Sequence, residues 1–483
     1  MRTSRLLVIA LLVLVLPTAA HARVRQPTLV GLTSTPALYP AFSPSIHDYV
    51  VRCHDETPVR FTTWAAAGTT PFVDGKAGRT ATVSLVPGAA ATIEGRNSSG
   101  ANAYYVRCLP SDFPSWTATG AGSSWVWYVT TPSISLGKTT AHYIAIFDGN
   151  GVPVWWYRTV RVPMDAKILP GPTPLFAFAS YPAASKNYEV RRLDGSLVQR
   201  VVSPDGHIDD HELQRLANGD LVLLVYRPKE HVDLTAYGGP ADATVLEAEI
   251  EEVSPTGQLV WSWSTDGQVD LSESARWLRT IIGTPVVIEG PETTYDFFHA
   301  NAVSIQNGVV LLSLRHTDGI YAIDRSTGNI LWKLGGTPTS QSLTVVHDPD
   351  GAQPLGGQHD VRFQPDGTVT VFDNGTFLGR APRAARYRID PAAHTATLLE
   401  QVSDPTVPTS LCCGSARRLV TGDWVVAWGG DPVVGEYRPD GTAVYRLRFD
   451  DSLFSYRAVP VSVAHLSAAT LRAAMDARAA RAT

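Results

Sequence analysis

Short runs of alternating apolar and polar residues fill the chain from about residue 27 onward, and Gly, Pro, Asn and Asp separate them. This alternation is typical of β-strands that bury one face. A helical pattern is confined to the Ala-rich segment after Ser467 and to a short stretch from Ser272 to Thr280. The sequence therefore predicts an all-β protein.

Two kinds of hairpin alternate between residues 122 and 450. In one, a turn glycine precedes a large residue by four positions, as in Gly151 to Trp155 and Gly328 to Trp332. In the other, a turn such as Asn307-Gly308 leads into an apolar strand. Two hairpins give four strands per repeat, which is typical of a β-propeller blade, whereas a pair of sandwiches or an up-and-down barrel would not explain the paired repeat. We expect a six-bladed β-propeller with blades at 122–160, 161–203, 208–265, 298–336, 357–403 and 413–450, an insertion at 266–297, and a C-terminal tail at 451–483 with a short helix.

Residues 27–110 predict a small N-terminal β-sandwich, and their pattern resembles the cadherin-like modules of secreted bacterial proteins. Tyr49-Val-Val-Arg-Cys53 and Tyr104-Tyr-Val-Arg-Cys108 are nearly identical strand patterns, so pairing of the two strands would join Cys53 and Cys108 in a disulfide. The adjacent Cys412 and Cys413 could form a vicinal disulfide or remain thiols.

The first 22 residues have the features of a secretory signal peptide. Arg2 and Arg5 precede an apolar run that ends at Leu16, and Ala20-His-Ala22 provides a cleavage site. An uncleaved anchor is the alternative, although the run is shorter than the ~20 residues that span a bilayer. We expect a secreted or extracytoplasmic protein with no membrane span after cleavage. The charged fraction of 18% and the net charge of −5 give no sign of a nucleic-acid partner.

Three histidines occupy one position of the repeat. His211 and His359 lie eight residues before their blade's turn glycine, and His299 lies nine before. These positions open the first strand of each blade, which lines the channel, so the imidazoles should converge there with Asn301, which shares the face of His299. Arg315 ends an apolar strand and is a candidate anion clamp. A structural hydrogen bond for each histidine and a structural salt bridge for Arg315 are the alternatives.

Residues 207–376 strongly resemble the PAPS-independent arylsulfotransferases, which are secreted six-bladed propellers. The matching stretches are Asp210-His-Glu-Leu-Gln-Arg-Leu-Ala-Asn-Gly219, Phe298-His-Ala-Asn-Ala-Val303, Leu312-Ser-Leu-Arg315, Ile330-Leu-Trp-Lys-Leu-Gly-Gly336, Gln358-His-Asp360 and Phe372-Asp-Asn-Gly375. The resemblance implies that a sulfuryl group passes from an aryl sulfate to a phenolic acceptor by a ping-pong mechanism. It implies His359 as nucleophile, His211, His299 and Arg315 as catalytic partners, Asn301 in substrate binding, and no metal or cofactor.

One departure from the family is the missing short-loop disulfide before the nucleophile, because no cysteine lies between residues 109 and 411. Two other functions stay open on the same residues. Three neutral imidazoles could hold a metal ion for hydrolysis, and a propeller without catalytic activity could bind an anionic or aromatic ligand through the histidines and Arg315.

Overall fold

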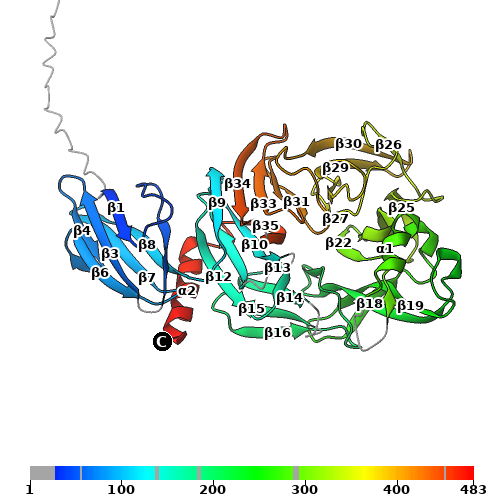
Figure 1. Cartoon of the computed structure of the whole chain (residues 1–483), viewed down its shortest axis with the longest axis horizontal. Coiled ribbons are helices and arrows are strands. Elements are labelled where there is room, and N and C mark those ends of the chain that lie inside the picture. Colours follow the sequence, from blue (N-terminus) through cyan, green and yellow to red (C-terminus); the bar gives the residue numbers. More distant parts are fainter. Residues whose placement is uncertain are drawn as a thin grey trace, which may run out of the picture.

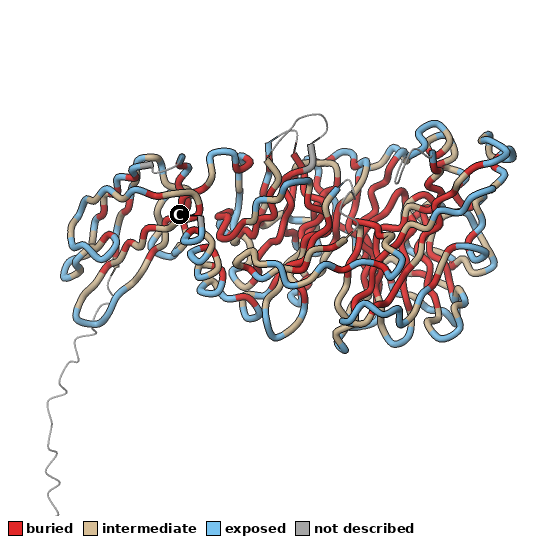
Figure 2. The backbone as a smooth tube through the Cα atoms, turned by 90° about the horizontal axis from the view of Figure 1, so that it is seen from below, coloured by how far each residue is buried: buried red, intermediate tan, exposed pale blue. Residues whose placement is uncertain are grey.

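The computed structural model describes residues 28–54, 57–135, 141–181, 187–286, 293–450 and 453–482. The predicted signal peptide lies outside the described residues. The described chain forms two β-rich parts, with one long helix between them (Figure 1). Buried residues follow the strands of both parts, while the connecting turns are mostly exposed (Figure 2). The all-β class is therefore confirmed.

The N-terminal part consists of two sheets, ordered β1-β3-β6 and β2-β8-β7-β4-β5. Both sheets bury apolar side chains in one shared core, to which Leu32, Phe61, Ile93 and Val106 belong. This is the two-layer arrangement of a β-sandwich. Its strands are β1 (Leu29–Thr35), β2 (Asp48–Cys53), β3 (Thr57–Ala65), β4 (Thr70–Val73), β5 (Lys76–Ala77), β6 (Thr80–Leu85), β7 (Ala90–Asn97) and β8 (Gly100–Pro110).

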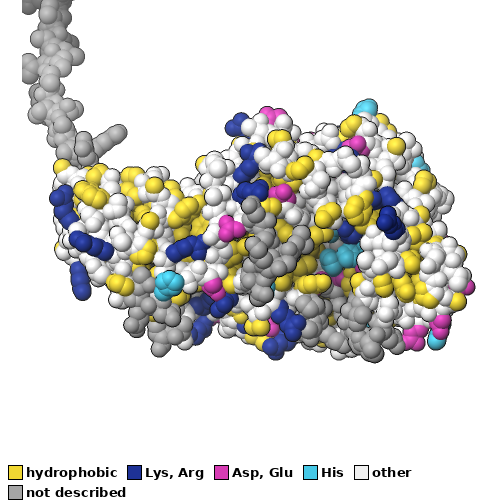
Figure 3. Space-filling model, in the orientation of Figure 1, with side chains coloured by type: hydrophobic (Ala, Val, Ile, Leu, Met, Phe, Trp, Pro, Cys, Tyr) yellow, Lys and Arg dark blue, Asp and Glu magenta, His cyan; other side chains and the backbone are white. Residues whose placement is uncertain are grey.

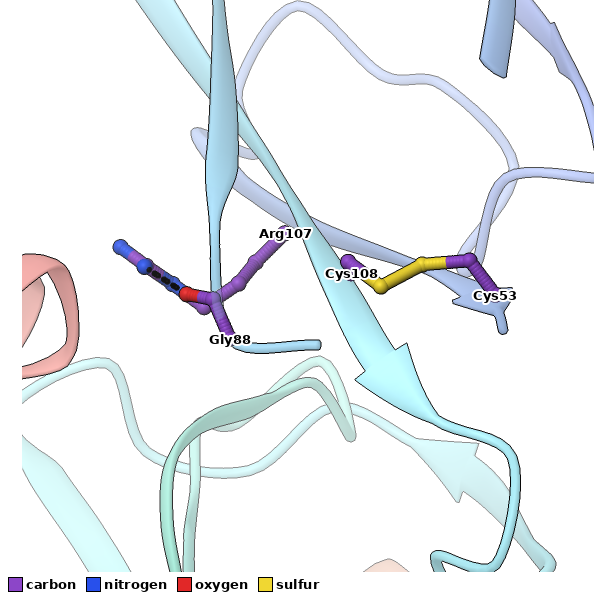
Figure 4. The surroundings of a disulfide bond; sticks show 4 residues. All are labelled: Cys53, Gly88, Arg107 and Cys108. Carbon is purple, nitrogen blue, oxygen red and sulfur yellow. Dashed lines mark hydrogen bonds between the residues drawn. A yellow bond between two sulfur atoms is a disulfide. The ribbon is translucent and has the colours of Figure 1, made fainter. Parts of the chain in front are cut away.

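A disulfide joins Cys53 to Cys108, as predicted, and the two Cα atoms are 5.7 Å apart. Strands β2 and β8 run parallel, with Val51 opposite Cys108. Because side chains alternate along a strand, Arg107 points away from the disulfide (Figure 4). Its guanidinium donates to the Gly88 carbonyl at 2.6 Å and to Asp476 at 2.7 Å. The end of β8 is thus fixed on both faces.

Six sheets form the propeller in the described chain, and they agree with the six expected blades. In chain order they are β12-β11-β10-β35, β13-β14-β15-β16, β17-β18-β19-β20, β22-β23-β24-β25, β27-β28-β29-β30 and β31-β32-β33-β34. Three extra strands extend three of them: β9 pairs with β34, β21 with β19 and β26 with β30.

The bounds of the propeller strands are β9 (Trp116–Gly120), β10 (Val126–Ser135), β11 (His142–Phe147), β12 (Pro153–Thr159), β13 (Val162–Leu169), β14 (Leu175–Tyr181), β15 (Tyr188–Arg192), β16 (Leu197–Val201), β17 (Leu213–Arg215), β18 (Leu221–Val232), β19 (Ala243–Val253), β20 (Leu259–Ser264), β21 (Thr294–Tyr295), β22 (Ala300–Gln306), β23 (Val309–Leu314), β24 (Gly319–Asp324), β25 (Ile330–Gly335), β26 (Thr344–Val346), β27 (His359–Phe363), β28 (Val369–Asp373), β29 (Arg383–Asp390), β30 (Thr395–Val402), β31 (Ser415–Arg418), β32 (Trp424–Ala427), β33 (Val433–Tyr437), β34 (Ala443–Phe449) and β35 (Leu453–Ser462).

Both ends of the propeller segment differ from the sequence-based boundaries. The expected propeller ended at residue 450, but β35 lies beyond it and pairs with β10 as the innermost strand of the first blade. At the other end, β9 precedes residue 122 and joins the outer edge of the last blade. The hairpin repeat does not mark either strand, because each pairs with a segment from the opposite end of the propeller sequence. The two strands close the ring from both sides.

The helices lie where the sequence placed them. Helix α2 (Ala468–Ala482) follows β35 and packs between the sandwich and β12 (Figure 1). Its Leu471 and Met475 belong to the core of the first blade, and Arg472 pairs with Asp48 of β2 at 2.6 Å. The insertion contains the 3-10 helix η2 (Leu271–Trp277) and α1 (Leu278–Gly283), and two further 3-10 turns are η1 (Thr235–Tyr237) and η3 (Arg315–Thr317). Among the described helices, none has the length and apolarity to cross a membrane.

Candidate functional site

The three predicted histidines lie where the innermost strands of three blades begin. His211 and His299 precede β17 and β22, and His359 is the first residue of β27. His299 and Asp360 have positive φ values of 51° and 59°. Next to them, β22 shifts its register against β23, and β27 shifts its register against β28. Such bulges bend a strand and redirect its side chains. Histidine side chains are visible in the middle of the propeller face, beside hydrophobic side chains (Figure 3).

The structure brings these histidines together with Arg315. The ring centroids of His211 and His299 are 5.0 Å apart. The His299 ring also lies 4.8 Å from that of His316, which Arg315 contacts, and the nearby Arg315, His211 and His299 all lower the pKa of the buried His359. The four residues that the sequence singled out therefore form one cluster.

The tautomer of His359 follows from its hydrogen bonds. Asn374 donates its side-chain amide to Ser410 and to the Cys413 carbonyl, so its oxygen faces His359. His359 Nδ1 lies 2.9 Å from that oxygen and 3.0 Å from the Gly357 carbonyl, and it must carry the proton because both are acceptors. The Nε2 lone pair accepts from the Cys413 N–H at 3.2 Å. Burial and the Arg315 charge hold the pKa of His359 well below its usual range, so the imidazole is neutral.

His211 has the opposite charge state. Its Nδ1 contacts both carboxylate oxygens of Asp209 at 2.8 and 2.9 Å. Burial disfavours the imidazolium, but Asp209 and Asp210 outweigh it and raise the pKa of His211 to about 9. His211 is therefore a cation at neutral pH, and its Nε2–H is a donor.

His299 contacts Asp296 through Nδ1 at 2.5 Å. Burial has the larger effect here and lowers the pKa of His299 despite this carboxylate. The site therefore holds one charged and two neutral members among its predicted histidines.

Arg315 emerges from the end of β23 with part of its guanidinium unused. It donates to the Leu411 carbonyl at 2.7 Å and to His316 Nε2 at 2.8 Å, while its Nε is buried without a partner. The guanidinium lies over the Trp277 ring, with Cζ 4.3 Å from the ring centroid. No carboxylate within 4 Å neutralises it among the described side chains. Arg315 can therefore offer a positive charge and a free donor to an anion.

Asn301 is fully buried, with an exposed fraction of 0%. Its amide nitrogen donates to the Gln358 carbonyl at 2.8 Å, and its side-chain oxygen has no partner. It joins β22 to the residue that precedes His359. Its contacts indicate a positioning role, whereas the resemblance implied substrate binding.

Sequence reasoning missed several members of the cluster. His316 lacks the repeat register, yet its Nδ1 donates to the Asp296 carbonyl at 2.7 Å and its Nε2 accepts from Arg315. Asp209 contacts His211 from two residues upstream, and Asp296 contacts His299 from three residues upstream. Asn374, which contacts His359, lies within the Asp-Asn-Gly stretch of the family resemblance. Acidic residues that shortly precede a repeat-register histidine were the available signal.

Cys412 and Cys413 are thiols in this structure, and their Sγ atoms are 2.9 Å apart. They lie on the loop that enters the last blade, and the Cys413 N–H of this loop donates to His359. A hydrogen bond from Cys413 and the charge of Arg315 lower the pKa of Cys412 against the effect of burial. The thiol pair is thus part of the site.

A second polar cluster, here called the axial ion network, adjoins the site. It consists of three carboxylates and four cations from five blades: Asp165, Glu212, Asp360, Lys167, Arg362, Arg417 and Arg457. Glu212 pairs only with cations from other blades within the network, whereas Asp360 pairs with Arg362 of its own strand as well as with Arg417.

The ligand atoms of His211, His299 and His359 do not come together as one group among the described residues. The described groups whose ligand atoms lie within 4.8 Å of one another are Asp296, His299 and His316, and Asp209, Asp210 and His211. Neither includes His359. Both ring nitrogens of His316 are already engaged, and the Arg315 guanidinium beside it repels a cation. These residues do not fit a metal held by three histidines.

The arylsulfotransferase (ASST) family model matches residues 187–450, more than half of the chain. No curated protein matches. Similar solved structures include a protein of unknown function from Bacteroides caccae, with 13% identity, a TM-score of 0.43, and coverage of 70% of this chain and 99% of that one. Another is a catalytically inactive variant of virginiamycin B lyase from Staphylococcus aureus with quinupristin, with 9% identity, a TM-score of 0.35, and coverage of 71% and 88%. The family match spans the blades that carry all four predicted catalytic residues, and the chain belongs to the arylsulfotransferase family.

Proposed function

We propose that this protein transfers a sulfuryl group from an aryl sulfate to a phenolic acceptor through a sulfohistidine at His359. The observation that carries the proposal is the state of His359. Its proton is fixed on Nδ1 by Asn374, its Nε2 carries the lone pair and accepts only from the Cys413 N–H, and its ring is neutral. A neutral imidazole with a fixed tautomer is a competent nucleophile.

In the first half-reaction, Nε2 attacks the sulfur of the aryl sulfate and the bond between sulfur and the aryl oxygen breaks. The electron pair of that bond leaves on the phenolate, which takes a proton from the His211 imidazolium. The products are the phenol, neutral His211 and N-sulfohistidine. Because the pKa of His211 is about 9, the imidazolium holds its proton at neutral pH. This pKa is also close to the pKa of a phenol, which favours proton transfer between the two groups.

In the second half-reaction, neutral His211 takes the proton of an acceptor phenol while the phenol oxygen attacks sulfur. The nitrogen–sulfur bond breaks and its electron pair returns to Nε2. Charge on the sulfuryl oxygens develops beside the unpaired Nε–H of Arg315. The Cys413 N–H, which contacts Nε2 in the free protein, is a donor to a sulfuryl oxygen once Nε2 is bonded to sulfur.

The sulfohistidine step is tested with donor alone. Full-length protein is incubated with 4-nitrophenyl sulfate without acceptor, quenched and analysed by peptide mass spectrometry. We expect one equivalent of nitrophenol and a sulfuryl adduct on the peptide that contains His359. An adduct on His211 or His299 would contradict the assignment of the nucleophile, and binding without release of nitrophenol would favour the non-catalytic ligand-binding function.

We also propose that the chain acts outside the cytoplasm. The N-terminal pattern that ends at Ala22 and the Cys53–Cys108 disulfide support this location, since disulfides persist in oxidising compartments. N-terminal sequencing of the protein from culture supernatant or periplasm should begin at Arg23. A chain that retains Met1 in the cytoplasmic fraction would contradict export.

A further inference from the structure

Phe377 is 70% exposed on the loop between β28 and β29, the same loop that carries Asn374. Its φ is 59°, in the left-handed region that a bulky side chain rarely adopts. Strained, exposed residues of this kind persist where the surrounding structure holds them, and they concentrate at functional sites. The conformation and exposure of Phe377 therefore indicate that its ring contacts a ligand.

The loop around Phe377 is fixed on both sides. The Asp373 carboxylate accepts from the Gly375 N–H at 3.0 Å, and the Thr376 hydroxyl donates to the Ser410 carbonyl at 3.2 Å. The Thr376 carbonyl accepts from Arg276 at 2.8 Å. The ring of Phe377 is thus presented from a rigid support.

Phe377 is connected to the anion-binding residue through one side chain. Its ring centroid lies 5.7 Å from that of the buried Trp277, and the Arg315 guanidinium lies 4.3 Å from the Trp277 ring. Phe377 therefore stands one aromatic ring away from the free donor of Arg315.

Leu411 approaches the same point from the loop that enters the last blade. Its side chain is 54% exposed, and its carbonyl accepts from Arg315 at 2.7 Å and from Thr376 at 3.4 Å. Two exposed apolar side chains, Phe377 and Leu411, thus lie on the two loops that meet at Arg315.

We propose that Phe377 and Leu411 form an aryl platform, a subsite that holds the ring of the donor or acceptor while Arg315 holds the sulfuryl oxygens. The choice of ligand rests on the proposed function. An aryl sulfate is apolar at one end and anionic at the other, which matches the order of side chains from Phe377 to Arg315. Contact between aromatic rings contributes to affinity beyond the burial of area, so the platform selects aromatic over alkyl sulfates.

The test separates binding from chemistry. Naphthalene-2-sulfonate and methanesulfonate carry the anionic group on carbon and cannot transfer it to histidine. Their affinities for the full-length protein are measured by calorimetry for the natural sequence, for Phe377→Ala and for Phe377→Trp. Trp64→Ala is the matched control, because Trp64 is another exposed aromatic residue, on β3 of the sandwich.

We expect Phe377→Ala to weaken naphthalene-2-sulfonate about tenfold, the scale of one lost aromatic contact, and to leave methanesulfonate unchanged. Phe377→Trp and Trp64→Ala should keep the natural affinity. With an aryl sulfate donor, Phe377→Ala should raise KM about tenfold with little change in kcat. Equal loss for both sulfonates, no loss at all, or no binding of naphthalene-2-sulfonate by the natural protein would overturn the platform. Binding that depends on Phe377 in a protein that never releases a phenol would support the platform and contradict the proposed transfer.

Discussion

The axial ion network and the histidine cluster adjoin each other, and they differ in whether their arginines form ion pairs with carboxylates. In the axial ion network, Glu212 contacts Lys167, Arg362 and Arg457, and Asp360 contacts Arg362 and Arg417. In the histidine cluster, Arg315 has no carboxylate within 4 Å among the described residues, and its Nε has no partner. Carboxylates there contact the histidines instead. Arg362 and Arg457 of the network also have an Nε without a hydrogen-bond partner, so the difference lies in the ion pairs. Cations that contact carboxylates fit a structural role, and a cation without a carboxylate partner fits a role in binding an anion.

The clearest way to separate the two clusters is to remove His359. His359→Asn should lower transfer by at least about 10⁴-fold, because the nucleophile of a covalent mechanism is lost. The melting temperature should change little, since the network keeps its pairs. Turnover and thermal unfolding are compared with His231→Asn, a histidine whose side chain is 80% exposed. A large loss of stability with modest loss of turnover would reverse the roles assigned to the clusters.

The converse change is made in the axial ion network. Arg457→Met leaves Asp165 and Glu212 without one of their cations, and the free energy of unfolding should fall by about 3–5 kcal/mol. Lys229→Met is the control, because Lys229 and Asp266 form an exposed pair that contributes about 0–1 kcal/mol. Denaturant unfolding measures both. A fall no larger than that of the control would mean that the network stabilises nothing.

Arg315→Lys asks whether geometry or charge matters at the histidine cluster. An ammonium group keeps the charge but loses the planar set of donors, and we expect kcat to fall about 10²-fold. Stability should stay within ~1 kcal/mol, because Arg315 forms no ion pair among the described residues that the change would break. Steady-state kinetics with an aryl sulfate checks this, and natural kcat in the lysine variant would show that a point charge suffices.

The smallest expected effect is a shift in pH dependence. With its pKa raised to about 9, His211 is protonated below pH 9, so the first half-reaction should decline as pH rises through that value. Asp209→Asn removes the main cause of the raised pKa and should move the alkaline limb of the rate profile down by about one pH unit or more. Asp296→Asn is the control, because His299 is already neutral. An alkaline limb that stays at pH 9 in Asp209→Asn would exclude His211 as the acid.

The raised pKa of His211 also makes the stability of the folded state depend on pH. A histidine whose folded pKa lies above its unfolded value of about 6.5 stabilises the folded state fully below that value. The contribution of His211 is lost as pH rises through 9.

The parts that the sequence predicted correctly depend on local repetition. Gly219, Gly308 and Gly367 mark the turns, so the blades and the register of His211, His299 and His359 followed from counting along the chain. The parts that it did not predict depend on long-range pairing. Strand β35 fills the first blade although no repeat turn precedes it, and Trp277 reaches Arg315 from an insertion that interrupts the repeat. Neither contact leaves a local signal.

The position of β35 has a consequence for the order in which the protein is made. Arg457 and its strand are made after every other strand of the propeller, yet they occupy the innermost place in the first blade. Until they arrive, β10 has an open edge and the carboxylates of Asp165 and Glu212 lack one counter-ion. The ring therefore cannot close before β35 has been made, and only then can the histidines of different blades face one another.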